Sequence, residues 1–438
     1  MRDPDALPDA LPDARPAAEI EIPELPADAL PEIDAARLWD RHMAMAKIGA
    51  RPVGGVHRLA LDADDIAAHR QLADWALARG FSVALDPVGN MFLRREGADP
   101  GAAPVVSGSH CDSQPTGGRF DGIYGVLCAL EAMETAEDRG IVTRRPLECV
   151  IWVNEEGSRF RPGCMGSEVY AGLLGLNAAL AKVGDDGGIL GDGVADLRAA
   201  LPEAGARALG TPFHALLEAH IEQGPLLEAG GELIGVVDRV QGHRRLAISV
   251  IGREDHSGGA PLSLRKDAFV DAIEVCRGLA DLCRDPSDVL RFTFGRFTVT
   301  PNAVSVVPGR VDMILDLRHP SQDELTRLGD LVAAEAAGFA KLCDVGVEDT
   351  SWHAPVRFSA SVQAAYGRAA DRRGYARRGI DSGGGHDARW FPGRWPTGML
   401  FIPCEAGISH NPAENVDPAH AAAGAQVMAD VMLELAMT

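Results

Sequence analysis

The chain has 438 residues, of which 46% are hydrophobic and 24% are charged, so it can bury a sizeable core and is not disordered throughout. Its length suggests two or three domains. The formal net charge of -21 argues against binding to nucleic acid or to anionic membranes, because such a surface repels phosphate.

Three further features predict a cytoplasmic protein. No apolar run approaches the roughly 20 residues of a membrane-spanning helix. The N-terminus is acidic, whereas a secretory signal peptide starts with basic residues followed by an apolar stretch. The eight cysteines are scattered without a CxxC pair, which is typical of a reduced protein.

Residues 1–32 contain seven prolines and nine acidic residues against two basic ones. A segment of this composition is not expected to bury a core, so we predict a disordered acidic tail. The spacing of Ala35, Leu38, His42 and Met45 then predicts an amphipathic helix that opens the folded part.

Short apolar runs alternate with helical stretches from about residue 78 to 236. This alternation predicts an α/β domain with a mostly parallel sheet, whose ligands bind at the carboxyl ends of the strands. Glycine-rich loops between apolar runs return after residue 350. We therefore predict a first domain made of residues 33–237 and 351–438.

The segment 238–350 has a different pattern. Alternating apolar residues predict strands near 246–250, 292–294, 311–317 and 344–347, and helical spacing appears at 263–283 and after a capping box at 321–324. The order β-α-β-β-α-β is that of a ferredoxin-like α+β unit. We predict that this unit is an inserted domain.

Candidate metal ligands follow two of the apolar runs. His110 ends a strand, and Asp112 is placed to orient its ring, as second carboxylates often do for metal-binding histidines. Asp121 lies in a glycine-flanked loop that opens a helix, where one carboxylate can reach more than one cation. A polar loop without metal is the alternative for both.

Glu155 and Glu156 come just after the apolar run 147–153. Two adjacent carboxylates in a poorly hydrated pocket repel each other, unless cations lie near them. One of them can then bind metal while its neighbour accepts a proton from water. On an exposed loop the pair would have no function.

His220 and His410 complete the set. Each lies near a glycine or proline turn, where a single histidine is more often structural. Together with His110, Asp121 and Glu156 they make three imidazoles and two carboxylates, which suit two zinc, manganese, cobalt or nickel ions that share a carboxylate.

Several long motifs occur in one order from about residue 40 to the C-terminus: GSHCDSQPTGGRFDG, NEEGSRF, HIEQGPLLE, PNAVSVVPG, DLR, GGGHDA and GISHNPAE. With them the chain resembles the M20 metallopeptidase superfamily. Within it, the chain is similar to the amidase/hydantoinase-carbamoylase branch, which contains N-carbamoyl-amino-acid hydrolases, β-ureidopropionases and allantoate amidohydrolases.

The resemblance implies a role for each residue of the metal site. One or both ions would be held by His110, Asp121 and His220, with Asp121 as the bridge. The second ion site would be completed by Glu156 and His410. Glu155 would be the general base, and Asp112 would orient His110.

The resemblance also implies that the inserted domain is a lid and a dimerisation domain. Its His256 would polarise the scissile carbonyl, and Asn302 and Arg318 would bind the substrate carboxylate. The pocket would also be lined by Gln223, Gly385 and His386. An arginine fork suits a carboxylate, although without the resemblance Asp316 and Arg318 read as a surface ion pair.

We therefore expect a homodimeric hydrolase with two divalent metal ions per chain, acting on the ureido C–N bond of small anionic N-carbamoyl α- or β-amino acids. The alternatives are an allantoate amidohydrolase, an aminoacylase or dipeptidase of the wider superfamily, and a non-catalytic binding protein. Ser257, Ala260 and Gly384 differ from the residues that are usual at these motif positions in the family that the chain resembles. These differences bear on which substrate is chosen.

Overall fold

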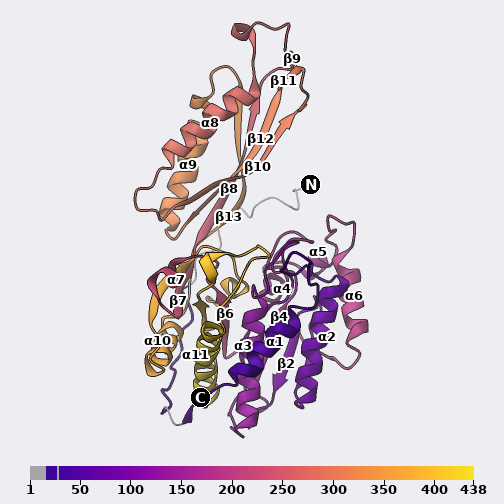
Figure 1. The fold of residues 1–438 in the computed structure, drawn as a ribbon, viewed down its shortest axis with the longest axis vertical. Helices are drawn as coiled ribbons and strands as arrows, with labels where there is room; N and C mark the ends of the chain where they lie inside the picture. Colours follow the sequence, from indigo (N-terminus) through magenta and orange to yellow (C-terminus); the bar gives the residue numbers. More distant parts are fainter. Residues whose placement is uncertain (1–15, 27–28) are drawn as a thin grey trace. The chain divides into compact units, whose positions relative to one another are not determined.

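The computed structural model describes residues 16–26 and 29–438, which form two compact units (Figure 1). The smaller unit is residues 239–356, and the larger unit contains 16–238 and 357–438. The chain thus returns to the larger unit six residues later than the predicted boundary at 350. The reason is that the last strand of the smaller unit runs from Asp344 to His353, beyond the apolar residues that predicted it.

The larger unit is built around a mixed sheet whose strands have the order β14-β7-β16-β6-β3-β4-β2-β1-β5, with β15 paired to β7. The central neighbours β16, β6, β3 and β4 are parallel, which confirms the predicted mostly parallel central sheet. The strands are β1 (Ser82–Leu85), β2 (Met91–Arg95), β3 (Val105–His110), β4 (Leu147–Trp152), β5 (Gly205–Ala206), β6 (Ala215–Ile221), β7 (Ile234–Val240), β14 (Val356–Arg357), β15 (Arg377–Ser382) and β16 (Thr397–Ile402).

Helices cover this sheet. They are α1 (Ala35–Met45), α2 (Ala63–Ala78), α3 (Ile123–Asp138), α4 (Met165–Tyr170), α5 (Leu176–Leu180), α6 (Leu190–Ala200), α7 (Leu226–Gly230), α10 (Ala360–Arg372) and α11 (Pro418–Ala436). The helices α1, α3 and α11 lie side by side (Figure 1). Nearly every residue of α3 and α11 is buried, which is typical of helices that are apolar on all sides. Asp417 caps α11 by accepting a hydrogen bond from the Ala419 amide.

Successive residues of the central strands pack into different cores. Val105 and Ile151 belong to the main core with α1, α3 and α11, whereas Val106 and Trp152 pack in a second, aromatic cluster with Phe391. This follows from the alternation of side chains along a strand, and it explains why β3 and β4 are apolar throughout. A sheet covered on both faces leaves its strand ends as the place where polar groups gather.

The smaller unit contains β8 (Gly242–Ile251), β9 (Asp255–His256), α8 (Ala268–Leu282), β10 (Arg291–Thr300), β11 (Val306–Val307), β12 (Arg310–His319), α9 (Gln322–Phe339) and β13 (Asp344–His353). Its main sheet has the antiparallel order β10-β12-β8-β13, and α8 and α9 pack on it. Its strands and helices therefore follow the β-α-β-β-α-β order that the hydrophobic pattern indicates. The Ser321 side chain caps α9 by accepting from the Glu324 amide.

The predicted disorder of residues 1–32 is wrong for the part that the structure describes, residues 16–26 and 29–32; the rest of that prediction lies outside the described residues. Ile20, Ile22 and Leu25 pack against the main core, and Leu30 is buried. The Glu19 carboxylate accepts hydrogen bonds from the first amides of α10. The prediction rested on overall composition, which does not show that these few spaced apolar residues hold the segment against the larger unit.

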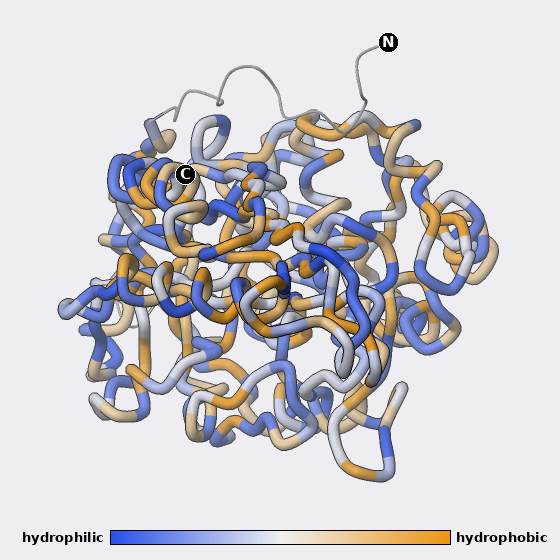
Figure 2. Tube along the Cα trace, turned by 90° about the horizontal axis from the view of Figure 1, so that it is seen from above, coloured by the Kyte–Doolittle hydropathy of each residue, from blue (hydrophilic) through white to orange (hydrophobic). Residues whose placement is uncertain are grey.

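No helix among the described residues is both long and apolar enough to cross a membrane. Figure 2 shows polar and apolar stretches alternating over short distances along the chain.

Candidate metal centre

Polar side chains gather at the carboxyl ends of the parallel strands. His110 is the last residue of β3, and His220 is next to last in the neighbouring β6. Glu155 and Glu156 follow the end of β4, which pairs with β3 on its other side. Parallel strands end at one edge of a sheet, so residues more than a hundred positions apart meet there.

Asp121 lies at the middle of this group. Its Oδ1 is 3.1 Å from His220 Nε2 and 3.8 Å from His110 Nε2. Its Oδ2 is 3.2 Å from His410 Nε2, which in turn is 3.5 Å from Glu156 Oε2. The structure therefore forms two groups of possible metal ligands that share Asp121, with one carboxylate oxygen facing each group.

The two groups differ in exposure. His110 and His220 are buried, whereas the side chain of His410 is 49% exposed, so the second group forms the open rim of the site. Gly122 has φ +65° and lies against the His110 ring, and a Cβ atom there would come within 2.3 Å of it. This glycine allows the Asp121 loop to approach His110.

Burial lowers the pKa of His110 to about 4, so its imidazole is neutral at pH 7 and has a lone pair available for a metal ion. Burial acts in the same direction on His220, but the hydrogen bond and charge of Asp121 outweigh it and raise its pKa to about 9. A metal ion beside Asp121 would replace that proton.

Asp112 does not orient His110 in the way we predicted. His110 Nδ1 lies 3.0 Å from the backbone oxygen of Asp112, whereas the carboxylate is 3.6 Å away. The two Asp112 carboxylate oxygens instead accept hydrogen bonds from the Glu155 and Glu156 amides. Asp112 thus holds the glutamate pair in place, and its backbone holds the ring.

The glutamates face different partners. Glu155 Oε2 is 3.5 Å from His110 Nε2, and its Oε1 accepts a hydrogen bond from the Cys164 thiol. Glu156 accepts two hydrogen bonds from Gln114, one from the backbone amide and one from the side-chain amide. Burial, followed by the neighbouring carboxylates, raises the pKa of Glu155 well above its usual value.

Sequence reasoning assigned no role to Gln114 or Cys164. Gln114 belongs to the QPTGG stretch of a motif, so its neighbourhood carried a signal, but residue type and spacing do not show that it binds Glu156. Cys164 lies nine residues from Glu155 and gave no signal at all.

Two of the predicted pocket residues lie at this edge. The side-chain amide nitrogen of Gln223 is 3.0 Å from Asp121 Oδ2 and 3.3 Å from His410 Nε2. The His386 ring packs edge-on against His220 with 4.6 Å between the centroids, and its Nε2 is 2.9 Å from Ser382 Oγ. Gly385 is exposed beside His386.

The other three predicted residues belong to the smaller unit. His256 is exposed on β9, and its Nδ1 accepts hydrogen bonds from the amides of Gly258 and Gly259. Arg318 lies on β12 with its guanidinium 3.3 Å from Asp316. Asn302 is exposed with φ +57°.

A further group of potential ligands is Asp65, His69 and Cys111. It is fully buried and bonded internally, because the Cys111 thiol donates to Asp65 Oδ1 and His69 Nδ1 contacts the Asp65 backbone oxygen. Burial, followed by the charge of Asp65, raises the pKa of Cys111 well above its usual value. The three side chains are fully buried and bond to one another, so we interpret this group as structural.

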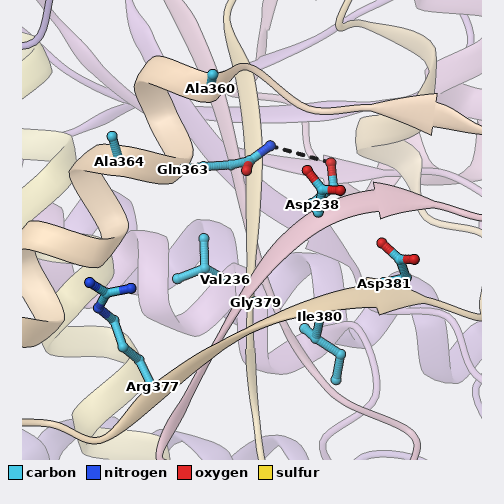
Figure 3. A pocket seen from close by; sticks show the side chains of 9 residues that line it. All are labelled: Val236, Asp238, Ala360, Gln363, Ala364, Arg377, Gly379, Ile380 and Asp381. Carbon is cyan, nitrogen blue, oxygen red and sulfur yellow. Dashed lines mark hydrogen bonds between the residues drawn. The ribbon is translucent and has the colours of Figure 1, made fainter.

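A hollow of about 580 Å³ lies between α10, β7 and β15 (Figure 3). Its lining includes Gln363, Arg377 and Asp381, and Gln363 donates a hydrogen bond to the Asp238 backbone. None of the predicted site residues lines it, so we do not place the reaction there.

The donor set around Asp121 fits divalent metal ions. Ligand atoms about 2.0–2.2 Å from a tetrahedral ion lie roughly 3.3–3.6 Å apart, which is close to the spacings of 3.1–3.8 Å measured here. Cations would also offset the repulsion among Asp121, Glu155 and Glu156.

The model of peptidase family M20/M25/M40 matches residues 106–434. The chain belongs to this family. Members of the family are metal-dependent, in agreement with the candidate ligand groups.

Individual relatives indicate which branch of the family this chain is similar to. An N-carbamoyl-L-amino-acid amidohydrolase of Rhizobium meliloti is 39% identical over 92% of this chain and 97% of that relative. An allantoate amidohydrolase of Escherichia coli K12 is 32% identical over 90% of this chain and 96% of that relative. The crystal structure of a hydantoinase/carbamoylase family amidase from Burkholderia multivorans is 43% identical, with a TM-score of 0.84 over 93% of this chain and 99% of that one. The resemblance is confirmed: this M20 family member is a hydrolase that acts on amide bonds.

Proposed function

We propose that the protein hydrolyses the ureido C–N bond of N-carbamoyl amino acids. One water is consumed, and the products are the amino acid, ammonia and carbon dioxide. The observation that carries this proposal is the Asp121 carboxylate, whose oxygens face two different ligand groups while Glu155 lies beside the first. The similarity to an N-carbamoyl-L-amino-acid amidohydrolase supports the substrate class.

In this proposal His110, His220 and Asp121 hold one divalent ion, and Asp121, Glu156 and His410 hold a second. When bound, the ions act as Lewis acids that make a water molecule more acidic. Glu155 accepts a proton from the attacking water and returns it to the leaving nitrogen. The hydrogen bond from Cys164 to Glu155 Oε1 leaves Oε2 on the side of His110, where that water would be.

The smaller unit is proposed to supply the substrate contacts as a lid. His256 Nδ1 accepts two backbone hydrogen bonds, so the proton of the neutral ring sits on Nε2. An Nε2–H donor suits the developing charge on a carbonyl oxygen. Asn302 and Arg318 would bind the carboxylate. In the larger unit, the pocket would be lined by Gln223, Gly385 and His386.

A substrate panel tests the proposal. We expect ammonia release from N-carbamoyl α- or β-amino acids in the presence of manganese, zinc, cobalt or nickel, and much slower release from allantoate. The Glu155→Gln protein, purified in parallel, controls for contaminating hydrolases. Turnover of allantoate alone would favour the allantoate amidohydrolase alternative, which the 32% identical relative supports. Turnover of acylated amino acids or dipeptides alone would favour the aminoacylase or dipeptidase alternative.

Metal removal gives a second expected result. An ion present at 100 times its dissociation constant stabilises the folded chain by about 2.7 kcal/mol. We therefore expect dialysis against a chelator to lower the melting temperature by several degrees and to abolish turnover, and added Mn²⁺ to restore both. Calorimetry and elemental analysis measure the effect, and an unchanged melting temperature would contradict the metal centre.

Homodimerisation and a cytoplasmic location stay predictions. Light scattering after size-exclusion chromatography measures the molar mass in solution and so tests whether the chain forms a dimer.

A further inference from the structure

Glu414 is a buried carboxylate to which no role has been assigned. It follows His410 by four residues and is 1% exposed. One oxygen accepts hydrogen bonds from the amides of Phe120 (2.8 Å) and Asp121 (3.1 Å). The other accepts from the hydroxyl of Ser409 at 2.9 Å. A single side chain thus joins the loop that carries Asp121 to the loop that carries His410.

The Asp121 loop is shaped around this carboxylate. A Cβ atom on Gly118 would come within 1.9 Å of the Glu414 carboxyl group, so a larger residue there displaces it. A neighbouring contact, from the Arg119 guanidinium to the side-chain oxygen of Asn415, runs between the same two loops. The two segments are 293 residues apart in the chain, so no local turn holds them together.

We propose that Glu414 is a positioning residue for the metal centre, which sets the Asp121 backbone relative to His410 so that each Asp121 oxygen faces its own ligand group. Glu414 belongs to neither of the two ligand groups that share Asp121, so we take it as a support for the ligands and not as a ligand itself. The proposal rests on the proposed function only in requiring that the centre binds divalent ions, and it does not depend on the substrate.

The test measures Mn²⁺ binding to the full chain by calorimetry, together with the rise in melting temperature on adding Mn²⁺. Loss of a group that supports metal ligands typically costs 10–100-fold in affinity. We expect such a loss in Glu414→Ala, with a smaller Mn²⁺-induced rise in melting temperature. Glu414→Gln keeps an acceptor for the two amides and can donate to Ser409, so it should bind within about threefold of wild type.

Two further variants keep the test decisive. Gly118→Ala replaces no metal ligand, but its added methyl group would displace the Glu414 carboxylate. It should therefore weaken Mn²⁺ binding as Glu414→Ala does, and it can be tested even if Glu414→Ala fails to fold. Asp271 is the matched control, because it is a buried carboxylate in the smaller unit that accepts hydrogen bonds from three backbone amides. Asp271→Ala should lower the melting temperature equally with and without Mn²⁺.

Wild-type Mn²⁺ affinity in folded Glu414→Ala or Gly118→Ala would overturn the proposal. Equal losses in Glu414→Gln and Glu414→Ala would also overturn it, because charge and not positioning would then be decisive. If wild type binds Mn²⁺ but hydrolyses no ureido substrate, the proposed function fails while this inference stands on the binding data.

Discussion

Replacing Glu155 by glutamine is expected to lower kcat by 100-fold or more while leaving the metal content unchanged. Removal of a general base typically costs about 10²–10⁴-fold. Glutamine has the same size as glutamate and can still accept the hydrogen bond from Cys164, but it cannot take a proton from water. Steady-state kinetics on an N-carbamoyl amino acid, with elemental analysis of the same samples, measure both quantities.

Glu168 provides the matched control for this substitution. It is a partly buried glutamate of the same unit, on α4, and burial raises its pKa as it raises that of Glu155. Glu168→Gln should keep turnover close to that of wild type. Near-wild-type turnover in Glu155→Gln would refute the role of Glu155 as the base, and loss of metal would show that it acts as a ligand.

The second large effect concerns stability in acid and depends on His42. This side chain of α1 is fully buried, and among the described residues neither ring nitrogen has a hydrogen-bond partner. Its ring packs against Phe120 and Tyr124, with centroids 5.3 and 5.8 Å away. Burial lowers the pKa of His42 to about 3. The spacing that placed His42 on the apolar face of a helix thus buried a titratable group.

The sign of the pH dependence follows from linkage. The folded pKa of His42 lies below the unfolded value of about 6.5, so below pH 6.5 the unfolded chain binds a proton that the folded chain excludes. This group therefore costs about 1.4 kcal/mol of stability for each pH unit between roughly 6.5 and 3.

Replacement of His42 by phenylalanine should remove this cost. We expect the difference in unfolding free energy between His42→Phe and wild type to grow by about 2–3 kcal/mol between pH 6.5 and pH 4.5. Urea denaturation at several pH values measures it. Both proteins have the same metal site, so acid release of metal largely cancels in the difference. A difference that does not vary with pH would contradict the assignment.

Much of the fold was predictable because its signals are local. The alternating apolar residues of β12, the capping box of α9 and the apolar run of β4 each predict an element without knowledge of its partners. The N-terminal segment was not predictable in this way. Ile20, Ile22 and Leu25 are too few to stand out from their acidic, proline-rich surroundings. Only their contacts in the folded chain, including hydrogen bonds to Ser361 of α10 and Glu434 of α11, explain why they pack against the core.

The sequence alone determined which side chains are available for chemistry, because each proposed ligand and the proposed base lies in a short motif. It also predicted the parallel sheet that gathers those strand ends at one edge. Only the tertiary structure decided how these side chains are arranged. One Asp121 oxygen faces His110 and His220, and the other faces His410. Asp112 accepts hydrogen bonds from the backbone amides of the two glutamates. The tertiary structure also decided that Gln114 donates hydrogen bonds to Glu156 and that Glu414 accepts one from the Asp121 amide. Hydrogen bonds between loops that are 42 to 293 residues apart depend on three-dimensional distance, and neither residue type nor spacing along the chain encodes that distance.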